Sequence, residues 1–237
     1  YSILKIKMLG YLFDFMFVSI VLGVAFFVSR GRMVHSAAHF VAVLLASLLA
    51  VSSFERIVQW IDAVYLSTTE EVLGFYLPFF TAVVIFAVCL AVFVWGIHRI
   101  LPEAPEVSPQ KETAGRWVFG VMNGYLIAAF LLTIIQTFPG PQDFWGTLPP
   151  DTGERPGPIL SIAPDYQFLA LSEYTIDHAF PVRGKWLLKR PVIPAARPGG
   201  RWSSFPYRYQ EFRSSIEQYY RGIEEETVEK DAGKRRI

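Results

Sequence analysis

The sequence has a single cysteine, Cys89, which lies inside a long apolar run. A lone cysteine forms neither an internal disulfide framework nor a cysteine-rich metal site. A surplus of one charge is also missing, because 22 basic and 21 acidic residues leave a net charge of +1. Nucleic-acid-binding surfaces carry a basic surplus, so the composition gives no electrostatic case for a nucleic-acid partner. No motif in the chain indicates a bound cofactor, and we expect none.

Charged side chains are nearly absent from two adjacent stretches near the start of the chain. Residues 8–28 carry Asp14 as their one charged group, and residues 33–53 carry only the histidines His35 and His39. As a helix, each stretch is roughly 30 Å long, which is the thickness of a hydrocarbon core. Because lipid cannot satisfy backbone N–H and C=O groups, we expect two membrane helices. The short turn between them makes these helices antiparallel neighbours.

Two more apolar stretches follow, at residues 72–101 and 116–138. The segment between them, residues 102–115, contains three prolines and mixed charge, which favours a loop. Residues 54–71 are amphipathic, and they extend the second helix into water or lie at the membrane interface. The expected fold class is therefore an all-α membrane protein with four transmembrane helices in residues 1–138.

The rest of the chain reads as a tail outside the membrane. Residues 139–208 are rich in proline and glycine and predict a largely irregular extramembrane arm, with a short helix or two around residues 168–174. Residues 209–237 predict a polar C-terminal helix with a frayed end. Aromatic side chains in a poorly ordered arm can anchor it on a partner. The candidate partner anchors are Trp186, Trp202 and Phe205.

Basic residues near the helix ends indicate the orientation. Five of them lie on the side of the first turn: Arg30, Arg32, Arg99, Lys111 and Arg116. Three lie on the other side: Lys5, Lys7 and Arg56. Because cytoplasmic loops carry the excess of lysine and arginine, this bias places the first turn in the cytoplasm and both termini outside. We expect Arg30 and Arg32 to fix this topology and to bind lipid phosphates.

Three polar residues within the apolar stretches are candidates for function or for packing. Asp14 is a proton or ion site, a partner for a basic group, an interfacial carboxylate near the helix end, or a buried hydrogen-bond partner. His39 lies one turn after His35, a spacing that can bind a metal, but no third ligand is near in the sequence. We therefore favour polar packing between helices for His39, and interhelical hydrogen bonding for Asn123.

Small residues recur in the fourth apolar stretch. Gly120 and Gly124 form a Gly-x-x-x-Gly pattern, with Ala128 one turn further. Such spacing lets two helix backbones approach closely in a membrane. We expect Gly120 and Gly124 to contribute to helix packing.

These features together resemble the colicin V production protein (CvpA) family over residues 8–138. The matching features are Asp14, Gly23, the Arg30-Gly31 pair, and the glycines that open the fourth helix. The family often has a basic residue where this chain has Asn123, so no role of that charge carries over. The resemblance implies a four-helix bacterial inner-membrane protein, linked by name to colicin V export and loosely to envelope integrity.

Some family members resemble this arrangement with a trypsin-like protease domain after the fourth helix, outside the cytoplasm. That placement agrees with the orientation above. The tail of this chain has no Gly-Asp-Ser-Gly-like nucleophile motif, so the protease activity does not carry over.

The most economical functional prediction is a non-catalytic scaffold or accessory subunit of a larger membrane assembly. Its partners would be membrane lipids and other membrane protein subunits, or further copies of itself. The alternative is a small homo-oligomeric transporter or channel component that uses Asp14 and the glycine face of the fourth helix. An enzyme ranks third.

Overall fold

The computed structural model describes residues 3–65, 71–101, 108–141, 144, 146–149, 155–179 and 205–234. Every regular element among these residues is an α-helix. The four long helices of the first half are α1 (Ile3–Val28), α2 (Met33–Tyr65), α3 (Glu71–Ile100) and α4 (Pro109–Ile135). The tail contributes α5 (Pro158–Ile162), α6 (Pro164–Ala179) and α7 (Phe205–Lys234).

Each of the first four helices contains an apolar stretch that is long enough to cross a membrane. These stretches are Ile6–Val28, Met33–Ile61, Gly74–Ile100 and Pro109–Ile135. The expected fold class is therefore confirmed: this is an all-α, multi-pass membrane protein with four candidate spans and a C-terminal helix.

Several helix boundaries differ from those expected. α4 begins at Pro109 rather than at residue 116, so half of the expected loop is helical. Proline suits a first helical turn because its missing N–H would have no intrahelical partner there. α7 begins at Phe205 rather than at residue 209, with Pro206 in its first turn for the same reason. α2 continues unbroken to Tyr65, so the described part of the amphipathic segment extends the second helix.

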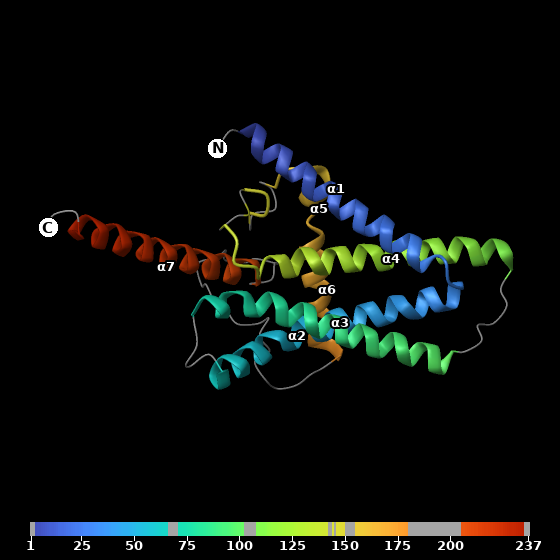
Figure 1. Ribbon diagram of the computed structural model, residues 1–237. Helices are drawn as coiled ribbons and strands as arrows, with labels where there is room; N and C mark the ends of the chain where they lie inside the picture. Colours follow the sequence, from blue (N-terminus) through green and yellow to red (C-terminus); the bar gives the residue numbers. More distant parts are fainter. Residues whose placement is uncertain are drawn as a thin grey trace.

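α4 is the central helix of the bundle. It packs against α1 on one side and against α2 on the other, and α2 also packs along α3. α6 lies crosswise on the bundle, across α4 and toward α2, whereas α7 runs away from the bundle toward the C-terminus (Figure 1). The tail is therefore partly folded onto the membrane helices.

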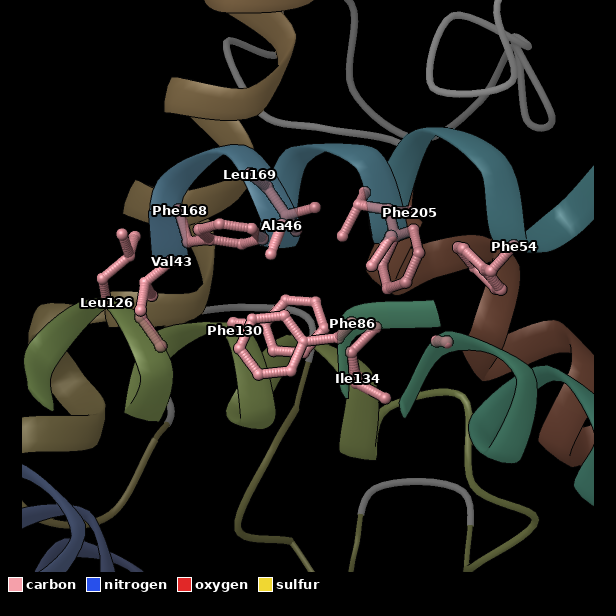
Figure 2. Packing of buried hydrophobic residues seen from close by; sticks show 14 of the residues in the cluster. Val43, Ala46, Phe54, Phe86, Leu126, Phe130, Ile134, Phe168, Leu169 and Phe205 are labelled. Atoms are coloured by element: carbon pink, nitrogen blue, oxygen red, sulfur yellow. The ribbon is translucent and has the colours of Figure 1, made fainter. Parts of the chain in front are cut away.

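The main hydrophobic core joins the spans to the tail helices. The rings of Phe86 on α3 and Phe130 on α4 stack with centroids 4.4 Å apart. Phe168 of α6 meets Phe130 edge to face at 5.8 Å, and Phe205 of α7 lies 6.2 Å from Phe54 of α2. Figure 2 shows these side chains pointing into one common layer. Because Phe130 lies in the spanning part of α4, α6 lies beside a membrane span and does not belong to a separate arm.

Candidate functional site where α1, α4 and the tail meet

Asp14 is the buried carboxylate of α1, and it binds the start of α5. It lies roughly three turns from the start of α1 and is 6% exposed. The Leu160 N–H donates to Asp14 Oδ1 at 2.9 Å, and the Ile159 N–H donates to Oδ2 at 3.4 Å. The first N–H groups of a helix have no intrahelical partner, and a negative charge is favourable there. Asp14 therefore anchors the tail to α1.

Two glycines make this close approach of α1 and the tail possible. A Cβ on Gly10 would lie 2.7 Å from Cγ of Pro156, which is closer than real Cβ contacts. Gly157 has φ +95°, a conformation that L side chains rarely adopt, and a Cβ there would overlap the Asp14 carboxylate. Only glycine fits at position 157, because the carboxylate occupies the space of a side chain.

A buried ion pair lies directly beside this anchor in the sequence. The Arg155 guanidinium donates two bonds to the Asp165 carboxylate, at 2.7 and 2.9 Å, and its Nε donates to the Pro149 carbonyl at 3.2 Å. The two side chains are 1% and 0% exposed. Gln136 Nε2, at the end of α4, donates to the same carboxylate at 2.5 Å. Buried charges are costly unless they are paired and hydrogen-bonded, and this pair meets both conditions.

Arg213 extends this polar network to α7. It is 2% exposed, its Nη1 donates to the Gln136 backbone carbonyl, and its guanidinium lies 5.0 Å from the centre of the Phe144 ring. Gln136 thus contacts α6 through its side chain and α7 through its backbone. The end of α4 is the point where both tail helices are attached.

The glycine pattern of α4 packs against α1 of the same chain. A Cβ on Gly120 would lie 2.9 Å from the Ala25 carbonyl oxygen, and a Cβ on Gly124 would lie 2.8 Å from Val21 Cα. The backbones of α1 and α4 therefore touch along this face, as small residues permit in membrane helices.

Asn123, also on α4, reaches the neighbouring helix α2. Its Nδ2 donates to the Ser36 carbonyl at 3.2 Å and to the Phe119 carbonyl of its own helix at 2.8 Å. The side chain is fully buried. It therefore links α4 to α2, which is the interhelical role that its position suggested.

A cluster of three histidines lies between α2 and α3 near the Arg30–Arg32 turn. The His98 ring lies 6.2 Å from the His35 ring and 6.0 Å from the His39 ring, between centroids. His35 Nε2 contacts the Leu101 carbonyl at 3.0 Å and His98 Nδ1 contacts the Val94 carbonyl at 2.7 Å, so both rings are oriented by backbone. Among the described residues, no group of three or more His, Cys, Asp or Glu side chains is arranged to hold a metal ion.

The arginines of the first turn lie at the surface between α1 and α2. Arg30 is exposed and its guanidinium lies 4.4 Å from the centre of the Phe26 ring. Arg32 is exposed at the start of α2, where Glu112 of α4 accepts a 2.7 Å bond from the Met33 N–H. Both arginines therefore remain accessible at the end of the bundle opposite the tail.

The expected partner anchors need one correction. Phe205 is 0% exposed and packs inside the core, so it cannot anchor a separate partner. The sequence placed it on an irregular arm, but it begins α7, where the rings of Phe54 and Tyr209 enclose it. Trp186 and Trp202 lie outside the described residues.

Sequence reasoning missed the residues that attach the tail: Arg155, Asp165, Gln136 and Arg213. The nearest available signal was the pair Gly157-Pro158, because proline at a first helical position and glycine before it suggest a helix start. Nothing in the sequence indicated that this start would meet Asp14.

No family model, curated protein or solved structure matches the chain. The fold and the site therefore define its class by themselves. It is a multi-pass membrane protein whose tail is attached to the spans by buried polar contacts.

Proposed function

We propose that this chain is a non-catalytic scaffold or accessory subunit of a larger assembly in a bacterial inner membrane, and that its four-helix part is related to the CvpA family. Both termini would lie on the periplasmic side. Its partners would be other membrane protein subunits and membrane lipids.

The observation that carries this proposal is the path of α7. Phe205, Tyr209 and Arg213 attach its first half to the bundle, and Tyr220 still contacts Phe75 of α3 with ring centroids 6.3 Å apart. Beyond this contact the helix runs away from the bundle (Figure 1), and Ile223 there is 44% exposed. A helix that is attached to the bundle and presents exposed side chains such as Arg221 and Ile223 away from it suits a protein-binding role, since apolar groups gain most when they are covered.

The arrangement of the polar groups within the spans supports a structural role over transport. Asp14 accepts backbone N–H groups from α5, and Asn123 donates to α2. Gly120 and Gly124 face α1 of the same chain, where they are not available for self-association. The homo-oligomeric transporter depends on Asp14 and these glycines, so it loses the features that suggested it.

The family relationship rests on the sequence features of residues 8–138. Of these, Gly120 and Gly124 pack on Ala25 and Val21 of α1. The orientation rests on the excess of basic residues at the Arg30–Arg32 end.

The proposal is tested by the state of the protein extracted gently from its native membrane. Native mass spectrometry of the full chain should show a complex with different subunits. A chain truncated after Arg221 keeps the part of α7 that contacts the bundle, removes Ile223 and the rest of the helix, and should lose the complex. A lone monomer for the full chain would contradict the proposal, and a complex of identical copies would favour the transporter.

A further inference from the structure

We propose that a groove between α2, α4 and α6 holds one acyl chain of a phospholipid from the leaflet on the side of the Arg30–Arg32 turn. This groove, called here the α6 groove, has a volume of about 420 Å³. Its walls include Phe40 of α2, Val121, Met122 and Tyr125 of α4, and Phe168 and Leu171 of α6. The proposal does not depend on the scaffold role.

The α6 groove lies at membrane depth and is open to lipid. Its α4 wall belongs to the span Pro109–Ile135, and its α2 wall belongs to the span Met33–Ile61. Val121 and Met122 are 44% and 40% exposed, and Leu171 on the opposite wall is 41% exposed. These apolar side chains need an apolar neighbour, and the surrounding solvent at this depth is lipid.

The groove is short enough to lie within one leaflet. From Val121 to Ala129, the α4 wall is roughly 12 Å long, within the roughly 15 Å that is half of a hydrocarbon core. α6 closes the far end, because Phe168 packs on Phe130, one residue beyond Ala129. The end near the Arg30–Arg32 turn has no such crossing helix among the described residues.

The crossing helix also selects the kind of occupant. A partner membrane helix is about 10–12 Å wide and needs roughly 30 Å of free length to pack along a span. α6 lies across α4 and takes away that length (Figure 1). An acyl chain is thin and ends at mid-membrane, so it fits beneath α6 without displacing it.

A basic side chain lies where the lipid headgroup would be. Lys111 is exposed in the first turn of α4, roughly 15 Å along the helix before Val121, which is the first α4 residue of the groove. It lies on the same helical stripe as Met122 and Tyr125. A lysine at a membrane surface attracts phosphate groups. The groove and Lys111 together match a phospholipid: an apolar chain below and a phosphate at the surface.

The test is native mass spectrometry of the full chain released from nanodiscs that contain equal amounts of phosphatidylethanolamine and phosphatidylglycerol. The wild-type chain should retain one phospholipid. Val121→Trp should lose it, because the larger side chain fills the groove. The matched control is Val88→Trp on α3, which is 57% exposed in a span, does not line the groove, and should retain the lipid. Lys111→Gln should lower the preference for phosphatidylglycerol.

A second filling variant and a second measurement keep the test decisive. If Val121→Trp melts at a lower temperature than the control, its loss of lipid could come from unfolding. Leu171→Trp, which fills the groove from α6, then replaces it as the filling variant. A phospholipid with a photoreactive acyl chain should crosslink mainly to the groove walls. Equal lipid retention in the filling and control variants would overturn the proposal, as would crosslinks spread evenly over α1 and α3. A bound polypeptide or free fatty acid in place of a phospholipid would also overturn it.

Discussion

Replacing one member of the Arg155–Asp165 pair should destabilise the attachment of the tail more than replacing both. Arg155→Met leaves the Asp165 carboxylate buried without its cation, and Asp165→Leu leaves the guanidinium in the same position. Breaking a buried pair in this way costs about 3–5 kcal/mol. That cost corresponds to roughly a hundredfold to a few thousandfold in the folding equilibrium.

The double variant, with both substitutions, removes the two charges together. Its remaining cost comes from the lost partners of Gln136 Nε2 and of the Pro149 carbonyl, about 1–3 kcal/mol for a buried group left unsatisfied. Each single variant leaves one of these two groups unsatisfied and leaves a buried charge unpaired as well. The double variant should therefore be more stable than either single variant, because the two substitutions act on one interaction.

The measurement is reversible unfolding in mixed detergent micelles, followed by a fluorophore on α6 and by circular dichroism. The matched control is Arg221→Met on the exposed part of α7, which should change stability by less than about 0.5 kcal/mol. Single variants that lose less than about 1 kcal/mol would refute the reasoning, since the pair would then behave as solvated. A double variant that loses the sum of the singles would refute it too.

Three further predictions concern the Asp14 contact, the glycine face of α4 and the membrane orientation. Asp14→Ala leaves two backbone donors of α5 unsatisfied and should cost about 1–3 kcal/mol; hydrogen exchange at the Leu160 amide should speed up, and unchanged protection would contradict the anchor. Gly124→Ala forces α1 and α4 apart and should cost about 1–3 kcal/mol. The matched control is Gly96→Ala, where a Cβ meets nothing within 4 Å; it should stabilise the helix by up to about 1 kcal/mol. Equal melting temperatures for the two variants would argue against close packing of α1 on α4. A reporter that is active only in the cytoplasm should be inactive when it is fused after Ile237. An active reporter would place the C-terminus in the cytoplasm and contradict the proposed orientation.

The fold was largely predictable because its strongest signal is local. Uncharged stretches long enough to cross a bilayer allow few structures, and the glycine spacing of α4 marks a face for close packing. Boundaries were less predictable, since proline ends a helix in some contexts and begins one at Pro109. Hydropathy gives the spans but not the exact turn at which each begins.

The candidate site was only half predictable because its contacts are not local. Asp14 was recognisable as a costly group, but its partners lie 145 and 146 residues later in the chain. Phe205 looked like an exposed anchor because its neighbours in sequence are proline and serine, and its real neighbours come from α2 and α7. The partner of a buried polar group depends on tertiary packing, which a single sequence does not display.

The distance in sequence between Asp14 and α5 has a consequence for biosynthesis. α1 is made first, and its carboxylate has neither of its two donors until residues 159 and 160 have been synthesised and have reached the same end of the bundle. α2, α3 and α4 must all be inserted before that contact forms. The bundle is therefore completed only after its last span, and a chain that ends before α5 carries an unmatched carboxylate in its first membrane helix.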